Sequence, residues 1–191
     1  MWMVCGYAEA RQVLSDPRFS RGAAAARGLA GTPTRRVRNP LERTHLPDLV
    51  RSQLVVGWQE ASRRIVTSLL ALLEHGDQLE VLRQRPSLLP RAVEELLHHD
   101  PHPASSLPPR LATEDIDVTG TLIPDGAAVV VPVFAANRDP RAFPAPDTLD
   151  ITRPAEDHLA FGQGAHYCPG AHLVRATMRA ALNAFLALPA T

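Results

Sequence analysis

A glycine-rich loop that carries a cysteine to the start of a helix constrains this chain more than any other feature of its sequence. The loop spans residues 161–170, and its two glycines, Gly162 and Gly164, are separated by one residue. Glycine adopts positive φ angles at little cost, so this spacing predicts a tight turn that can approach a flat ligand closely. His166 precedes the thiol of Cys168 by two residues.

A helix is predicted directly after the cysteine. Pro169 is favoured at the first position of a helix, and residues 171–186 are mostly good helix formers. Cys168 is therefore expected at a helix N-terminus, where free N–H groups and the positive end of the helix dipole favour a thiolate over a thiol. A thiolate on such a loop suits the axial position of haem iron.

These residues resemble the haem-binding loop of the cytochrome P-450 family, Phe-Gly-x-Gly-x-His/Arg-x-Cys-x-Gly, and every fixed position up to Gly170 is filled. The resemblance implies that Cys168 ligates the iron of haem b, that His166 binds a haem propionate, and that Phe161 packs beneath the ring near the sulfur. One alternative is a plain turn with an ordinary buried cysteine. A nucleotide-binding loop is not favoured, because the third glycine of the dinucleotide fingerprint is absent and no Gly-Lys-Ser/Thr follows.

Charge and composition exclude several other classes of protein. The chain has 191 residues, 45% of them hydrophobic, which is enough for a globular core. Basic and acidic residues balance at 20 each, so no net charge favours nucleic-acid or membrane binding. The two cysteines, Cys5 and Cys168, form no C-x-x-C pair. Since no signal peptide and no apolar run long enough for a membrane span is visible, we expect a cytoplasmic protein.

The patterning predicts a mainly α fold with a small antiparallel β-sheet, arranged as a partial cytochrome P-450 fold. We expect a single partial domain over residues 1–191, with 1–51 as an N-terminal remnant and 52–191 running from a long central helix through the haem-binding loop. Residues 21–38 are expected to form a loop. Helices are expected at 7–15, 47–74, 77–85, 88–99 and from 169 to 186, and short strands at 2–5 and within 110–133.

Further segments resemble the family and imply more haem contacts. Residues 39–46 are similar to the family's Asp-Pro-Pro-Glu-His-Thr-Arg-Leu, in which a histidine and an arginine hold a propionate; Arg43 and His45 stand there in exchanged order. Arg110 matches the arginine of a strand that contacts the second propionate. Residues 136–140, Ala-Asn-Arg-Asp-Pro, match another signature of the family.

The chain also departs from the family pattern. Family members are much longer, so we expect the segments that roof the substrate pocket and the C-terminal strands that line it to be missing, through an internal deletion and a C-terminal truncation. The oxygen-activating pattern aligns on residues 56–60, where Gln59 replaces an acid and Glu60 replaces an alcohol. Because glutamine cannot relay a proton by ionising, we expect these two catalytic positions to work poorly.

A second departure concerns a structural cluster. In the family, one glutamate pairs with two arginines and so holds the haem loop in place. Here the glutamate is Glu95, His98 replaces one arginine, and Thr148 replaces the other. We therefore expect Glu95 to be poorly compensated, a defect that typically costs about 3–5 kcal/mol when the pair is buried.

The resemblance implies a haem-thiolate monooxygenase that inserts one oxygen atom from O2 into a small, hydrophobic organic substrate. Its electrons would come from a ferredoxin-like donor with an NAD(P)H reductase, and neither nucleic acid nor a membrane span is expected. The alternative is a catalytically inactive haem-binding or interaction module, or the remnant of a deleted gene. A zinc site is the third hypothesis. Its candidate ligands are His98, His99 and His102, or His166, Cys168 and His172.

Overall fold

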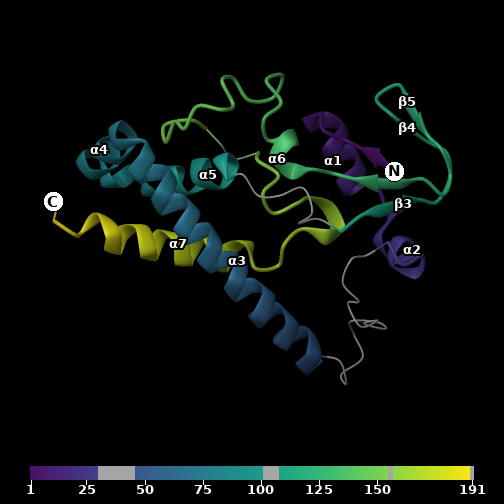
Figure 1. The fold of residues 1–191 in the computed structure, drawn as a ribbon, viewed down its shortest axis with the longest axis horizontal. Helices are drawn as coiled ribbons and strands as arrows, with labels where there is room; N and C mark the ends of the chain where they lie inside the picture. The colour runs from purple at the N-terminus through teal and green to yellow at the C-terminus, as the bar shows by residue number, and fades with distance from the viewer. Residues whose placement is uncertain (30–45, 101–107, 155–156, 190–191) are drawn as a thin grey trace. The chain divides into compact units, whose positions relative to one another are not determined.

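A computed structural model describes residues 1–29, 46–100, 108–154 and 157–189 (Figure 1). Among these residues the helices outweigh the strands, which form one four-stranded and one two-stranded sheet, and this confirms a mainly α fold with small sheets. The four-stranded sheet contains one parallel pair, whereas an antiparallel sheet was predicted. The chain divides into two compact units, and the single domain with its boundary after residue 51 stays a prediction. The first unit takes residues 1–33, 101–148 and 157–168, and the second takes 34–100, 149–156 and 169–191.

The main sheet of the first unit combines strands from distant parts of the sequence in the order β1-β6-β3-β2. The pair β1–β6 is parallel, whereas β6–β3 and β3–β2 are antiparallel. A separate antiparallel hairpin joins β4 to β5. The strands are β1 (Trp2–Met3), β2 (Phe19–Ser20), β3 (Arg110–Ala112), β4 (Ile116–Val118), β5 (Thr121–Ile123) and β6 (Ala128–Val130).

The helices of the first unit include one that the sequence analysis placed in a loop. Helix α2 (Arg21–Ala26) begins where a loop was predicted, so that prediction is wrong for these residues. The hydroxyl oxygen of Ser20 accepts a hydrogen bond from the N–H of Ala23 at 3.0 Å, which caps the helix, and the alanines that follow are good helix formers. Residues 30–38 of the predicted loop lie outside the described residues. The other helices are α1 (Tyr7–Ser15), as predicted, and α6 (Val133–Ala136).

The core of the first unit lies between α1 and the strands. Helix α1 buries one face, because Ala10, Val13 and Leu14 recur at helical spacing. These side chains join one continuous apolar cluster with side chains from both sheets. The other members are Val4, Phe19, Ala112, Ile116, Val118, Ile123, Val129, Val131, Ala136 and Leu159.

The second unit is built from helices, and α7 packs against both α3 and α5 (Figure 1). Helix α7 buries a stripe at every third or fourth residue, formed by Ala171, Val174, Met178 and Leu182. In the described part of the chain, no helix is both long and apolar enough to cross a membrane. The elements are α3 (Leu46–Glu74), α4 (Gly76–Gln84), the short 3-10 helix η1 (Pro86–Leu88), α5 (Leu89–His99) and α7 (Ala171–Leu186).

The buried face of α3 includes only some of the leucines of this helix. Leu70 and Leu73 are 52% and 58% exposed. Among residues 57–74 of this helix, whose side chains are described, the buried residues are Arg64, Ser68 and Leu72, which repeat every four positions and so share one face. Leucine content alone therefore does not identify the packed face of this helix.

A buried carboxylate ties the start of α1 to the chain that follows α6. Oδ2 of Asp139 accepts a hydrogen bond from the N–H of Tyr7 at 2.9 Å, and both carboxylate oxygens accept bonds from the side chain of Arg141. The hydrogen bonds from Arg141 and Tyr7 hold the pKa of Asp139 far below its usual range. This carboxylate therefore stabilises the first unit as an anion.

We expect Asp139→Asn to lower the free energy of unfolding by about 2 kcal/mol at neutral pH, because charged hydrogen bonds are lost from a buried site. The folded pKa is depressed, so the stabilisation is present above the unfolded carboxyl pKa of about 4 and disappears as pH falls through the folded value. Urea unfolding at several pH values should show the parent approaching the variant in acid. Asp125→Asn, at an exposed position, is the control. A deficit that is constant with pH would contradict the assignment.

Candidate functional site

The cysteine loop has the backbone that its glycines predict. Gly162 and Gly164 both have a φ of 72°, in the left-handed region. The N–H of Gly162 donates a hydrogen bond to the carbonyl of Leu159 at 2.8 Å, and the N–H of Cys168 donates to the carbonyl of Phe161 at 2.9 Å. These bonds close the loop on itself and bring the cysteine backbone beside that of Phe161.

Gly164 is needed for a second reason, which is its close approach to the end of α1. A Cβ atom at Gly164 would lie 2.8 Å from the carbonyl oxygen of Leu14 and 2.9 Å from the Cα of Ser15. At Gly162 the nearest atom to such a Cβ would be the carbonyl oxygen of His166, at 3.8 Å. Both glycines provide the turn, but only Gly164 also permits the contact with α1.

Side chains anchor the loop from outside. Oδ1 of Asn137 accepts a hydrogen bond from the N–H of Leu159 at 2.8 Å in a buried position. Nε of Arg11, on α1, donates to Oε1 of Gln163 at 3.0 Å. The sequence analysis noted the signature of residues 136–140 without a role for Asn137, and the structure supplies that role.

Helix α7 begins later than predicted. Its first residue is Ala171 and its N-cap is Gly170, so Pro169 precedes the helix instead of occupying its first position. Glycine is accepted at an N-cap position, so Gly170 can cap the helix and Pro169 lies in the turn before it. Cys168 is a free, partly exposed cysteine two residues before that cap, and Cys5 is also free and exposed.

Phe161 is buried in the first unit, with 6% of its surface exposed. Its ring lies 6.0 Å from the ring of His158 and 6.3 Å from that of Tyr167, measured between centroids. These contacts fix the ring next to the loop that carries the thiol. Its predicted role beneath a haem ring stays a prediction.

Three cationic side chains gather in the first unit. Arg110, the first residue of β3, is buried, and burial followed by the charge of Arg21 lowers its pKa to about 10. Burial also lowers the pKa of Arg21. His166 lies in the short 3-10 helix η3 (Gly164–His166), and burial, then Arg21 and Arg110, lower its pKa. Arg110 and His166 were predicted from the sequence as ligand contacts. The nearness of Arg21 to them was not predicted, because residues 21–38 were expected to form a loop.

The cluster formed by Arg21, Arg110 and His166 lacks a neutralising acid. Within the described part of the chain, neither guanidinium makes a hydrogen bond or ion pair. Buried charges are normally paired, so such a cluster is suited to an anionic ligand. The two carboxylates of a haem group would satisfy these donors. The same unit also has a partly exposed thiol and a glycine turn, so the residues present fit haem. Arg43 and His45, also predicted to hold a propionate, lie outside the described residues.

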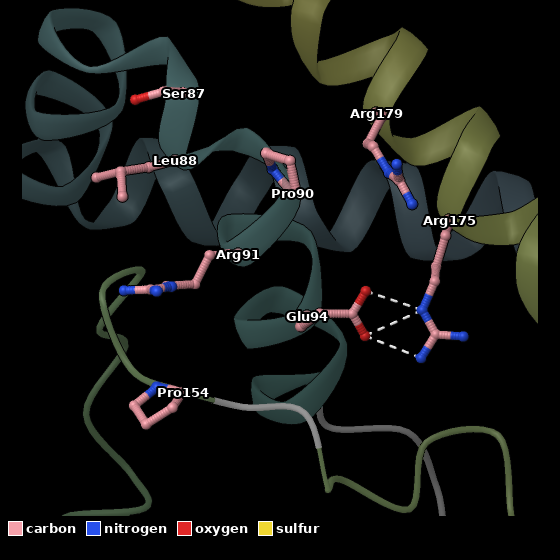
Figure 2. A pocket seen from close by; sticks show the side chains of 8 residues that line it. All are labelled: Ser87, Leu88, Pro90, Arg91, Glu94, Pro154, Arg175 and Arg179. Carbon is pink, nitrogen blue, oxygen red and sulfur yellow. Dashed lines mark hydrogen bonds and ion pairs between the residues drawn. The ribbon is translucent and has the colours of Figure 1, made fainter.

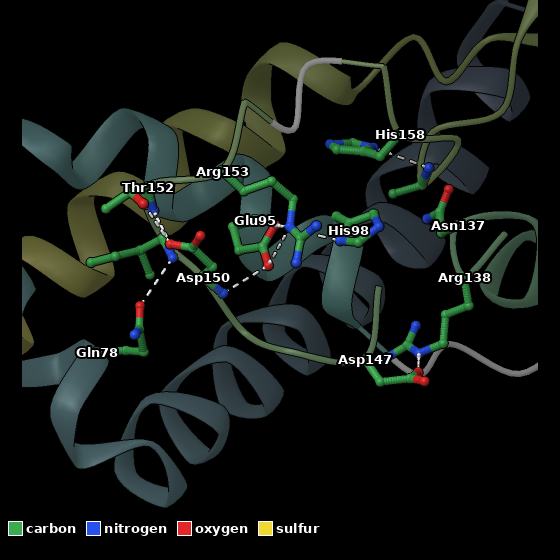
Figure 3. Close-up of polar contacts among 12 residues, drawn as sticks. Gln78, Glu95, His98, Asn137, Arg138, Asp147, Asp150, Thr152, Arg153 and His158 are labelled. Atoms are coloured by element: carbon green, nitrogen blue, oxygen red, sulfur yellow. Dashed lines mark hydrogen bonds and ion pairs between the residues drawn. The ribbon is translucent and has the colours of Figure 1, made fainter. Parts of the chain in front are cut away.

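A buried ion cluster in the second unit surrounds Glu95 (Figure 3). Nε of Arg153 lies 3.3 Å from Oε1 and 3.2 Å from Oε2 of Glu95, and Nδ1 of His98 lies 3.4 Å from Oε2. The N–H of Asp150 donates to Oε1 at 3.0 Å. Glu95 and His98 are fully buried, and Arg153 is nearly so. The carboxylate is thus met by an arginine, a histidine and a backbone N–H.

This arrangement corrects the prediction that Glu95 is poorly compensated. The resemblance to the family placed the second cation at position 148, where this chain has an exposed threonine. The cation is instead Arg153, five residues later, on the segment whose backbone is also held by Gln78: the N–H of Ile151 donates to Oε1 of Gln78 at 3.1 Å. The sequence does contain a signal for this partner, since Arg153 is the first arginine that follows Thr148.

The two substituted catalytic positions lie on α3. Gln59 is exposed, and Glu60 is partly exposed. Oε2 of Glu60 accepts hydrogen bonds from Arg63 at 3.4 and 3.5 Å, as expected for residues three apart on a helix. A role for either residue in proton transfer stays a prediction.

The second unit also has a surface cavity of about 580 Å³ that contains none of the predicted site residues (Figure 2). Between its walls, Glu94 of α5 and Arg175 of α7 form a two-pronged ion pair with contacts of 2.8, 3.0 and 2.9 Å. This pair joins α5 to α7. The lining residues are Ser87, Leu88, Pro90, Arg91, Glu94, Pro154, Arg175 and Arg179.

The proposed zinc sites find no support among residues 1–29, 46–100, 108–154 and 157–189. No group of three or more histidine, cysteine, aspartate or glutamate side chains is placed there to hold a metal ion. His102, a member of one predicted set, lies outside these residues.

Comparisons with known proteins identify the same family that the cysteine loop resembles. The sequence model of the family Cytochrome P-450 matches residues 75–187. Cytochrome P-450 105C1 from Streptomyces sp is 46% identical over 133 residues, which are 70% of this chain and 35% of that protein. Cytochrome P-450 monooxygenase PikC from Streptomyces venezuelae is 43% identical over 133 residues, 70% of this chain and 32% of that protein.

Solved structures give the same result. The crystal structure of the putative thioether synthase SgvP, involved in the tailoring step of griseoviridin, matches with a TM-score of 0.68 and 40% identity, over 72% of this chain and 35% of that one. The chain therefore belongs to the cytochrome P-450 family. It spans about a third of the length of the curated relatives it matches, and its fold is a partial cytochrome P-450 fold.

The two loop glycines allow a matched test of the contact with α1. Gly162→Ala should cost about 1–2 kcal/mol of unfolding free energy, because alanine is strained at positive φ. Gly164→Ala should cost a further ~1–3 kcal/mol, because its Cβ would also collide with the backbone of α1. Chemical denaturation of both variants measures the difference. Equal losses would show that the close approach is unimportant.

The Glu95 cluster predicts a large effect at Arg153. Arg153→Gln should lower the free energy of unfolding by about 3 kcal/mol, because it leaves a buried carboxylate with less compensation. Arg153→Lys should lose less, since it keeps the charge. Arg85→Gln removes the same charge at an exposed position of the second unit and is the control. If thermal and urea unfolding show no difference between Arg153→Gln and this control, Arg153 is not the partner of Glu95.

Proposed function

We propose that this chain binds haem b through Cys168 and acts as a cytochrome P-450 monooxygenase. The observation that carries the proposal is the cysteine loop, whose glycines have positive φ, in the same unit as buried cations that lack an acid. Relatives named as monooxygenases support it, and the comparisons do not favour the alternative of an inactive haem-binding module or gene remnant. When bound, haem held by a thiolate supplies the chemistry of dioxygen activation.

The residues of the first unit would bind and orient this group. Cys168 would ligate the iron as a thiolate. Arg110 and His166 would bind the haem carboxylates, since both are cations or donors without a carboxylate partner in the described chain. Phe161 would pack against the ring near the sulfur, and Gly162 with Gly164 would keep side chains away from the ring.

The resemblance places Gln59 and Glu60 of α3 at the positions where the family has its proton-relay acid and its alcohol. Gln59 can hold a water molecule through its amide but cannot take up or release a proton. Glu60 has a carboxyl group that can carry a proton, and its Oε2 accepts hydrogen bonds from Arg63. The proposal includes a small hydrophobic substrate and electrons from a ferredoxin-like donor with its NAD(P)H reductase, as the family membership implies.

The optical spectrum of the reduced, carbon monoxide-treated protein tests the proposal. The parent should show the red-shifted band that distinguishes thiolate-ligated haem, and Cys168→Ser should abolish it. Cys5→Ser is the matched control, because Cys5 is a free exposed cysteine outside the loop, and it should leave spectrum and haem content unchanged. Retention of the band in Cys168→Ser, or its loss in Cys5→Ser, would overturn the assignment.

A further inference from the structure

Strand pairing brings Arg21 to the same place as Arg110. Strands β2 and β3 are antiparallel, with Phe19 opposite Ala112 and Ser20 opposite Leu111. Arg21 directly follows Ser20, where β2 ends and α2 begins, and Arg110 directly precedes Leu111, so the pairing of Ser20 with Leu111 brings both arginines to the same end of the β2–β3 pair. Helix α2 also packs against β3. The pairing of the strands thus brings the backbones of the two arginines together, and the charge of Arg21 acts on Arg110.

The approach of these arginines is unfavourable without an anion. Arg21 interacts electrostatically with both Arg110 and His166, and every one of these interactions is repulsive when the groups are charged. Arg21 is half-buried, and its pKa is lowered by that burial. Within the described part of the chain it makes no hydrogen bond or ion pair. Two like charges, those of Arg21 and Arg110, lower stability in a partly desolvated place unless a ligand neutralises them.

We infer that Arg21 is a third cation of the haem carboxylate site, where it binds a propionate together with Arg110 and His166. The inference rests on the proposed function and extends it by a residue outside the haem-loop motif and the other segments that resemble the family. Arg21 offers a planar fork of N–H donors, which suits two-pronged binding of a carboxylate. It acts on the carboxylates of the ligand and not on the iron.

The test compares haem with its dimethyl ester, in which both carboxylates are blocked. Arg21→Gln should release haem about tenfold faster to an excess of apomyoglobin, because a charge-assisted hydrogen bond is lost. Release of the dimethyl ester should be the same in variant and parent. Arg21→Lys, which keeps the charge without the fork, should fall between parent and Arg21→Gln. Equal acceleration for haem and ester, or no acceleration for haem, would overturn the inference.

The haem-free protein gives a second readout with the opposite sign. Because Arg21 repels Arg110 when no anion is bound, Arg21→Gln should leave the thermal stability of the haem-free protein equal or higher. A purely structural arginine would lower it. Arg27→Gln is the control: it removes a charge at the exposed end of the same helix, where Arg27 donates to the carbonyl of Gly126 at 3.2 Å, and should not affect haem release.

The two proposals fail in different ways. A parent protein without the thiolate spectrum would overturn the proposed function and this inference with it. A parent with that spectrum, combined with unchanged haem release in Arg21→Gln, would overturn the inference alone.

Discussion

The contact between Gly164 and the end of α1 is the constraint on which the rest of the site depends. It requires a residue without a Cβ, in a left-handed conformation, against the backbone of Leu14 and Ser15. Because the loop is fixed there, His166 is held near Arg110 and Arg21, and Cys168 follows in a backbone-bonded turn. The geometry of the candidate site therefore comes from packing of the loop on α1, with Asn137 fixing the other end of the loop.

The two units differ in how their buried charges are compensated. In the second unit, Glu95 is fully buried and is met by Arg153, His98 and a backbone N–H, so the cluster is neutralised within the fold. In the first unit, the guanidinium of Arg110 is buried beside another arginine and has no acidic partner among the described residues. The first arrangement stabilises a fold, whereas the second lowers stability in the absence of a ligand. Such local cost is typical of a binding site.

Short-range patterns account for much of the fold. The sequence predicted α1 with its correct bounds, the end of α7 and the short strands after residue 110, because helical spacing, β-branched runs and turn residues act over a few positions. It misplaced the start of α7, since Pro169 is compatible both with a helix and with the turn before one. It also took α2 for a loop, because the cap that starts this helix depends on the backbone conformation of Ser20.

By itself the sequence determined the family and the positive-φ turns of Gly162 and Gly164, because these residues lie in a motif whose chemistry is local. The roles that it assigned to Cys168, Arg110 and His166 stay predictions. Only the tertiary structure decided which charges are paired. Arg153 meets Glu95 from 58 residues away, and Arg21 meets Arg110 through the register of two strands. The spacing of residues in the sequence does not predict such contacts, since they depend on how separate elements pack.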